Sequence, residues 1–342
     1  MRNLPADLAP ERLRQVLADA WRIRVASLEY VPEGGGAYHW KLTDDEGRHR
    51  FVTVDDLDDK DWLGQTRQAV LDGLGRAMDT AAALRHQAGL EFVVAPVATS
   101  DGELLCPIDS RYTVSVFPFL TGRSHPFGPY ADERLRDEAL DMLAALHRCT
   151  SVVRDRALSH LPSFTARGEF DAFLRAPGLP WDGGPFSAAA HGLLMPSVAD
   201  LVKLTTGFDN LVDLTSAARA NRVITHGEPH PANLMSADGR LHLIDWDTAA
   251  LAPPERDLSL VVTADGEGID RYQEATGRRV EPAVITMYRV RWYLDDLASA
   301  VRLFRNRHRD STDTRRWWQG LAPRLERLPE WLDLIAKQTD VG

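Results

Sequence analysis

Three short motifs follow one another between Ile224 and Leu258, and together they constrain the fold more than any other feature of the sequence. They read ITHGEPHPANLM, HLIDWD and APPERDL. Short apolar runs on both sides of the first polar loop predict two strands. The loop between them holds Glu228 and Asn233 five residues apart, and the second strand delivers Asp245.

These side-chain types, in this order, are the set that kinase-type phosphoryl transfer requires. A carboxylate must orient and deprotonate the attacking hydroxyl, and an amide oxygen and a second carboxylate must hold Mg²⁺ against the phosphates. Mg²⁺ prefers oxygen ligands and takes only a few of them from the protein. Taken singly, each motif has a simpler interpretation, such as a structural histidine at His226 or a solvated turn at the Asp-Trp-Asp triplet. The prediction depends on all of them occurring in order.

The motifs resemble those of the aminoglycoside phosphotransferases and choline kinase-like proteins. HGEPHPAN is similar to the catalytic loop of that family, whose usual form is His-Gly-Asp-x-x-x-x-Asn. IDWD is similar to its metal-binding motif, and PPERDL to the Pro-x-x-Asp-Leu that follows. Within the family, IDWDTAALAPPERDL looks closest to the spectinomycin phosphotransferase branch.

The hydrophobic pattern along the chain predicts two lobes. Runs typical of strands lie at 25–31, 37–43, 50–54, 92–98 and 112–119, and helical spacing lies at 10–20, 61–87, 132–147, 200–220 and beyond 281. With the resemblance, this indicates an α+β, bilobal, protein-kinase-like fold. We expect a small antiparallel nucleotide-binding lobe with one long helix over 1–119, ending in a hinge. A larger, mainly helical catalytic and acceptor-binding lobe is expected over 120–342.

The resemblance implies a role for each residue of the three motifs. Glu228 takes the position of the catalytic base. Asn233 and Asp245 take the positions of the Mg²⁺ ligands. His226 becomes a structural residue near the metal-binding motif, and Asp257 is expected to brace the loop without reacting.

Nucleotide-binding positions follow from the same resemblance. Gly34, Gly35 and Gly36 become the loop that covers the phosphates, although three glycines alone would indicate only a hairpin turn. Backbone groups between Phe117 and Phe119 become the hinge that reads the nucleotide base. The donor is expected to be ATP or GTP.

Two departures from the family pattern bear on activity. Glu228 stands where the family has Asp, which extends the carboxylate by one methylene. The family also places a phosphate-binding Lys on the third strand, where this chain has Thr53. The alternatives are that Lys60 or an arginine reaches the phosphates instead, or that Lys60 belongs to a solvated charged turn, DDLDDKDW.

The acceptor side is less clearly marked. The helical region after 281 contains Trp292, Asp295 and Asp296. The resemblance implies that an acidic pair in this region can hold a cationic antibiotic. The alternative, favoured for Asp296, is that one of these acids caps a helix or bridges to the many nearby arginines. Asp247 could serve either the metal ion or the acceptor.

Charge and composition limit the partners. Lys plus Arg number 40 and Asp plus Glu 50, a net charge of −10. An acidic surface disfavours a general nucleic-acid binder and suits a cationic small substrate. No apolar run reaches the ~18 residues of a membrane span, and the two cysteines have no metal spacing. We expect a soluble, cytoplasmic protein without a membrane or nucleic-acid partner; the sequence does not indicate its oligomeric state.

These observations favour a Mg²⁺- and nucleotide-dependent O-phosphotransferase acting on an aminoglycoside- or aminocyclitol-like antibiotic. Two alternatives stay open. The missing strand lysine and the Glu-for-Asp exchange would suit a pseudokinase that only binds a ligand. A kinase fold with altered phosphate contacts could also transfer a nucleotidyl group.

Overall fold

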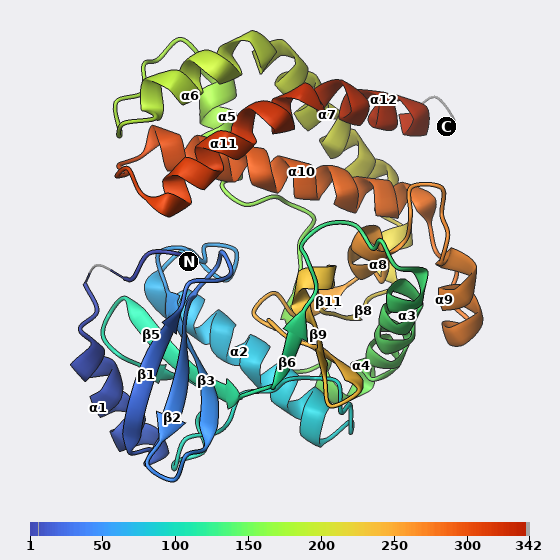
Figure 1. The fold of residues 1–342 in the computed structure, drawn as a ribbon. Helices are drawn as coiled ribbons and strands as arrows, with labels where there is room; N and C mark the ends of the chain where they lie inside the picture. Colours follow the sequence, from blue (N-terminus) through green and yellow to red (C-terminus); the bar gives the residue numbers. More distant parts are fainter. Residues whose placement is uncertain (6, 340–342) are drawn as a thin grey trace. The chain divides into compact units, whose positions relative to one another are not determined.

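The computed structural model describes residues 1–5 and 7–339 and packs as two compact units (Figure 1). The first unit comprises residues 1–160 and 222–280, and the second comprises 161–221 and the chain from 281 onward. The mixed α+β architecture expected from the sequence is confirmed. The lobe boundary expected at 119–120 lies within the first unit and stays a prediction.

An antiparallel five-stranded sheet forms the N-terminal part of the first unit, in the order β1-β2-β3-β5-β4. Its strands are β1 (Val25–Val31), β2 (Tyr38–Asp44), β3 (His49–Asp56), β4 (Cys106–Pro107) and β5 (Tyr112–Pro118). Helices α1 (Pro10–Trp21) and α2 (Arg67–His86) flank it (Figure 1). The strand predicted at 92–98 is wrong, because Val93 forms only an isolated bridge with Leu243, just before Asp245.

Strand β3 has two distinct faces because side chains alternate along a strand. Val52 and Val54 are fully buried in the core that α1 shares with the sheet. Thr53 and Asp55 point to the opposite face. The register pairs Thr53 with His39 of β2. The position where the family places its lysine is therefore on the face away from this core.

The helix predicted from residue 61 begins later, at Arg67, because Thr66 caps it by accepting a hydrogen bond from the Ala69 amide (3.2 Å). Residues 57–66 instead form a loop that packs closely on the first turns of α2. A Cβ added to Gly73 would lie 2.7 Å from the carbonyl oxygen of Leu63. This close approach fixes the loop that carries Lys60.

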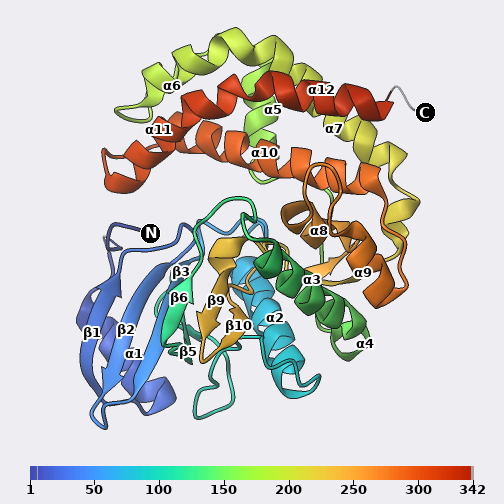
Figure 2. The same cartoon turned by 45° about the vertical axis from the view of Figure 1, so that its right-hand side comes forward.

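Two smaller sheets complete the first unit, in the orders β10-β9-β6 and β7-β11-β8. Figure 2 shows β6, β9 and β10 side by side. The strands are β6 (Gly122–Ser124), β7 (Leu158–Ser159), β8 (Val223–Thr225), β9 (Leu234–Ala237), β10 (Arg240–Leu243) and β11 (Ala250–Ala252). The helices are α3 (Glu133–Arg148), α4 (Thr150–Val153), α8 (Glu255–Val261) and α9 (Ile269–Thr276).

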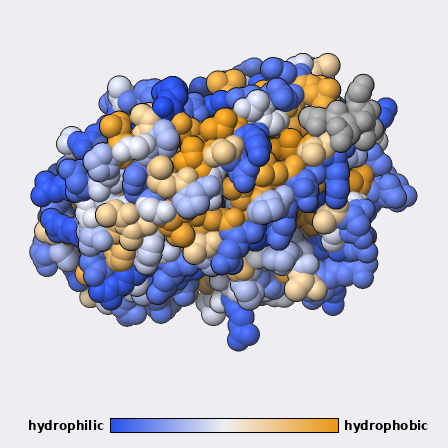
Figure 3. Space-filling view, turned by 90° about the horizontal axis from the view of Figure 1, so that it is seen from above, coloured by the Kyte–Doolittle hydropathy of each residue, from blue (hydrophilic) through white to orange (hydrophobic). Residues whose placement is uncertain are grey.

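The second unit is helical. It contains α5 (Arg167–Arg175), α6 (Ser187–Leu194), α7 (Val198–Leu214), α10 (Pro282–Arg305), α11 (Thr312–Glu326) and α12 (Leu328–Thr339). Its core gathers buried aromatic and aliphatic side chains such as Phe173, Phe208 and Phe304. Apolar residues also form a band on one outer face (Figure 3). The exposed apolar side chains of this unit include Val202 and Leu214. Within the described part of the chain, no helix has the length and apolarity needed to cross a membrane.

The contact between the loop 57–66 and α2 predicts opposite effects for two glycines of one helix. Gly73→Ala brings its new methyl against the Leu63 carbonyl and is expected to lower the free energy of unfolding by about 1–3 kcal/mol. Gly75→Ala meets only Leu105 at 3.9 Å, and helix propensity should then raise stability by up to about 1 kcal/mol. Urea denaturation measures both. Equal effects of the two substitutions would contradict the contact.

Candidate active site

The backbone of the loop after β8 is held by one buried carboxylate. Asp257, from α8, accepts hydrogen bonds from the amides of His226 (2.9 Å) and Gly227 (2.6 Å) and is 3.0 Å from His147 Nε2. Burial alone would raise the pKa of Asp257, but the His147 contact and the Arg256 charge outweigh it, and the pKa is lowered. Gly227 has φ +102°, and a Cβ there would lie 2.3 Å from the Arg256 guanidinium. Glycine is therefore required at this turn.

His226 joins the loop after β8 to the segment after β10 that carries Asp245. Its Nδ1 accepts a hydrogen bond from the Glu228 amide (3.2 Å), so the ring proton lies on Nε2, which donates to the Ile244 carbonyl (2.9 Å). Burial lowers the pKa of His226 to about 4, so the ring is neutral. The ring also packs edge-on against Trp246, with centroids 4.7 Å apart. These contacts set the spacing between Glu228 and the strand that ends before Asp245.

Glu228 and Asn233 lie at the two ends of the loop and are linked directly. The Asn233 amide nitrogen donates to the Glu228 carbonyl (2.9 Å), so the amide oxygen is the atom of this side chain that could bind a cation. The Glu228 side chain is 36% exposed, and its carboxylate is 4.0 Å from His230 Nε2. Burial lowers the pKa of His230 to about 4. A half-exposed carboxylate beside a neutral imidazole can approach an incoming hydroxyl.

Asp245 follows β10 with a backbone conformation that is rare for a residue with a side chain. Its φ is +68°, in the left-handed region, which is uncommon outside glycine and concentrates at functional sites. The residue keeps access to solvent, yet the surrounding protein desolvates its carboxyl. Together with the carboxylates of Asp247, Glu228 and Asp55, this raises the pKa of Asp245 well above its usual range.

Lys60 enters the same site from the loop between β3 and α2. Its side chain is 1% exposed, and its ammonium forms ion pairs with Asp247 and, at 3.0 Å, with Asp55. Burial alone would lower the pKa of Lys60, but Asp247, Asp55 and Asp245 outweigh it and raise the pKa, so the group is charged. A Cβ on Gly36 would lie 3.9 Å from the ammonium nitrogen. The glycine-rich turn and Lys60 are therefore adjacent.

The donor set around Asp245 fits a divalent cation that is shared with phosphates. One ammonium faces the carboxylates of Asp55, Asp245 and Asp247, so the cluster holds more negative than positive charge. An additional cation would relieve the repulsion that raises the pKa of Asp245. Among the described residues, no three His, Cys, Asp or Glu side chains form a complete metal site. Mg²⁺ commonly binds one or two protein ligands and completes its coordination with phosphate and water.

The remaining nucleotide-binding candidates lie on the N-terminal sheet or its glycine turn. Thr53 Oγ1 is 3.3 Å from His39 Nδ1, and burial, together with nearby positive charges that include Lys60, lowers the pKa of His39 to about 3. Neither side chain therefore supplies a cation. Phe117 and Phe119 are half-buried where β5 ends, and the Lys41 ammonium lies 5.2 Å from the Phe119 ring. Gly34 and Gly35 are exposed on the turn between β1 and β2.

The proposed acceptor residues on α10 are engaged with neighbouring groups of the second unit. Asp295 forms an ion pair with Arg291 (3.0 Å) and accepts a hydrogen bond from the Thr165 amide (2.6 Å). Asp296 forms an ion pair with Arg324 (3.0 Å). Trp292 is half-buried. Both carboxylates therefore form ion pairs with arginines in this structure. Trp292, Asp295 and Asp296 lie on the same helix, α10.

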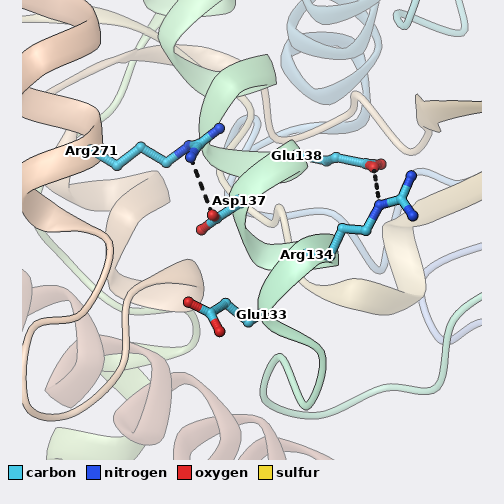
Figure 4. A pocket seen from close by; sticks show the side chains of 5 residues that line it. All are labelled: Glu133, Arg134, Asp137, Glu138 and Arg271. Atoms are coloured by element: carbon cyan, nitrogen blue, oxygen red, sulfur yellow. Dashed lines mark hydrogen bonds and ion pairs between the residues drawn. The ribbon is translucent and has the colours of Figure 1, made fainter.

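A separate surface hollow lies between α3 and α9 and contains none of the predicted site residues (Figure 4). Its lining side chains pair among themselves: Arg271 with Asp137 (3.1 Å) and Arg134 with Glu138 (3.2 Å). Exposed ion pairs of this kind contribute little to stability or binding. The hollow therefore adds nothing to the site around Lys60 and Asp245.

Sequence reasoning missed three residues of the site. Asp55 pairs with Lys60, His147 contacts Asp257, and Arg256 fills the space that a side chain at Gly227 would need. A signal for Asp55 exists, because an acid at the end of a strand, two residues after the expected lysine position, lies on the same face. The partners of Gly227 and Asp257 come from other elements, and no local pattern indicates them.

The α+β fold, with an antiparallel N-terminal sheet and a helical C-terminal part, is that of kinase-like phosphotransferases. The chain belongs to the phosphotransferase enzyme family (APH), whose profile matches residues 27–293. The family predicted from the three motifs is thereby confirmed.

Known proteins are similar to this chain in sequence or in fold. Protein StrN of Streptomyces griseus is 27% identical over 273 residues, which cover 76% of this chain and 79% of that protein. The spectinomycin phosphotransferase APH(9)-Ia, in complex with ADP and spectinomycin, has a TM-score of 0.68 at 15% identity, covering 96% of this chain and 98% of that chain. Amicoumacin kinase hAmiN, in complex with AMP-PNP and Ca²⁺, has a TM-score of 0.57 at 14% identity, covering 94% of each chain. At such identities the two solved structures show a common fold.

The contacts of Asp257 predict that replacing one of its carboxylate oxygens with an amide NH₂ group will lower the free energy of unfolding. In Asp257→Asn, an NH₂ group replaces one acceptor oxygen and faces a donor. The expected loss is about 1–3 kcal/mol in the free energy of unfolding, because buried donors lose their partner. Hydrogen exchange at the His226 and Gly227 amides should become faster. The exposed Asp270→Asn on α9 is the control and should change stability by less than about 0.5 kcal/mol.

Proposed function

We propose that this protein is a Mg²⁺-dependent O-phosphotransferase that moves a phosphoryl group from ATP or GTP to a hydroxyl of a small cationic antibiotic, of the aminoglycoside or aminocyclitol type. The observation that carries the proposal is the convergence of Glu228, Asn233, Asp245 and Lys60 in one unit. The family assignment supports the reaction. The complexes of related folds with ADP and spectinomycin, or with AMP-PNP and Ca²⁺, support a nucleotide, a divalent cation and an antibiotic acceptor.

In this mechanism each residue has one task. Glu228 accepts the proton of the attacking hydroxyl and orients that oxygen toward the phosphate. Asn233 and Asp245 would hold Mg²⁺, which when bound supplies charge neutralisation at the phosphates. Lys60 offers its ammonium to the same phosphates, below the turn formed by residues 34–36. Base recognition is assigned to the backbone between residues 117 and 119.

The acceptor is proposed to bind through acidic and aromatic groups. Asp247, Trp292, Asp295 and Asp296 are the candidates, and an ammonium group of the acceptor would exchange with the arginines that now pair with the two α10 carboxylates. The net charge of −10 favours attraction of a cationic acceptor. We expect the protein to act in the cytoplasm, where nucleotides are available, in antibiotic resistance or self-protection.

The test is incubation with a panel of hydroxyl-bearing antibiotics and choline in the presence of Mg-ATP or Mg-GTP, followed by mass spectrometry. A mass gain of one phosphoryl group is expected, and it should vanish with EDTA and in Asp245→Ala. Equal activity of that variant would contradict the metal assignment. A nucleotidyl mass gain would identify the alternative transfer reaction. Absence of a thermal shift with millimolar Mg-ATP would favour a pseudokinase.

The assignment of Glu228 as base predicts a separation of catalysis from binding. Glu228→Gln keeps the shape but cannot take a proton, and we expect kcat to fall about 10²- to 10⁴-fold. Glu228→Asp, the residue usual in the family, retracts the carboxylate by one methylene and should lower kcat by about 10²-fold, because the base then lies farther from the attacking hydroxyl. Nucleotide affinity should stay unchanged in both variants. Glu46→Gln, an exposed acid paired with Arg48, is the control.

If Lys60 binds the phosphates, its removal should lower the affinity for ATP but not for adenosine. Lys60→Met should weaken ATP binding about 10- to 100-fold, the value of one charge-assisted contact, and leave adenosine affinity unchanged. Since this variant leaves two acids without their ammonium, its thermal unfolding is measured first, and Lys60→Arg serves as the charge-retaining variant. Lys203→Met, an exposed residue of α7, is the control. An equal loss of affinity for adenosine and for ATP would contradict a contact between Lys60 and the phosphates.

A further inference from the structure

We propose that Asp55 is a positioning residue that holds the Lys60 ammonium toward the nucleotide phosphates. In protein kinases, the phosphate-binding lysine of the third strand pairs with a glutamate of the long helix in the small lobe. Here the pair is formed between a loop lysine and a strand carboxylate. The inference deepens the proposed function and rests on the phosphate-binding role of Lys60.

The Lys60–Asp55 pair is buried and lies on the face of the sheet that also carries Thr53. Asp55 is 3% exposed, Lys60 is 1% exposed, and Asp55 Oδ1 is 3.0 Å from the ammonium nitrogen. Asp55 is two residues beyond Thr53, so both side chains leave β3 on the same side. The loop 57–66 thus returns a lysine to the face from which a strand lysine at position 53 would have extended.

Helix α2 offers no acid that could take the partner's place. Its acidic residues are Asp72 and Asp79, and both are exposed. Its buried face consists of apolar and small residues, namely Val70, Gly73, Leu74, Ala77, Met78, Thr80, Ala81, Ala83 and Leu84. A buried ammonium requires an anionic partner to offset its desolvation. Asp55 meets this requirement from the strand.

The adjacent acid, Asp56, has a different task. It points to the opposite face and accepts hydrogen bonds from the Arg111 guanidinium at 2.6–3.0 Å. Its backbone and carboxylate also accept from the amides of Asp59 and Asp58 at the start of the loop. Asp56 therefore anchors the loop, whereas Asp55 contacts the ammonium. Neighbouring carboxylates with similar burial provide a matched pair of variants.

The second partner of Lys60 explains why a fixed partner is needed. Asp247 also pairs with the ammonium, from the turn between β10 and β11. An ammonium has three donors, so phosphate oxygens can replace Asp247 while Asp55 retains one donor. Without Asp55, the ammonium would be drawn toward Asp247 and Asp245, and its contact with the phosphates would weaken.

The experiment measures ATP and adenosine affinity by calorimetry for the whole protein, Asp55→Asn, Lys60→Met and the double variant. Asp55→Asn should weaken ATP binding about tenfold and leave adenosine binding unchanged. In the Lys60→Met background, the same substitution should have no further effect on ATP. Asp56→Asn should lower the melting temperature without changing the ratio of ATP to adenosine affinity. If Asp55→Asn does not fold, Asp55→Glu, which displaces the carboxylate by one methylene, should also weaken ATP selectively.

The outcomes separate this inference from the proposed function. Wild-type ATP affinity in Asp55→Asn, with weakened binding in Lys60→Met, would overturn the role of Asp55 alone. An additional loss of ATP affinity in the double variant would also overturn it, because the two residues would then act independently. A wild-type protein that binds no Mg-ATP would overturn the proposed function and this inference with it.

Discussion

A buried ammonium that faces several carboxylates is the interaction on which the candidate site depends. Lys60 is drawn into the protein by Asp55 and Asp247, and its charge partly offsets the repulsion among the acids around Asp245. Removing one charged partner from such a cluster lowers stability by more than the intact cluster contributes to it, because the remaining charges stay buried without compensation. The cluster therefore fixes the loop after β3, the end of β10 and the glycine turn against one another.

The loop after β8 is stabilised by different interactions. Its backbone amides are satisfied by Asp257, and its two ends are tied by His226 and Asn233. None of these contacts involves the half-exposed carboxylate of Glu228. The contacts that hold this loop are therefore made by other groups than the carboxylate that we propose as the base.

The sequence predicts the parts of this protein whose signals are local. The family follows from the resemblance of the three motifs to known sequences. Hydrophobic periodicity predicts the strands of the N-terminal meander, and motif spacing predicts the loop that contains Glu228 and Asn233. The failures involve partners that are distant in sequence. The segment 92–98 is apolar because it packs beside Leu243 without joining the sheet. The helix expected from residue 61 gives way to a loop because Thr66 caps the helix and Lys60 is held elsewhere. The strand position of Asp55 follows from the sequence, but its lysine partner and the role of Arg256 beside Gly227 depend on tertiary contacts.

The close packing of Leu63 on Gly73 has an evolutionary consequence. Surface connections usually accept insertions and deletions at small cost. The segment between β3 and α2 is different, because its tip is held by a backbone-to-glycine contact and its middle carries a buried charge. One added residue would shift the ammonium by up to about 3.3–3.6 Å, the span of one extended residue. Among relatives that also lack a strand lysine, the length of this connection should vary less than its residue identities.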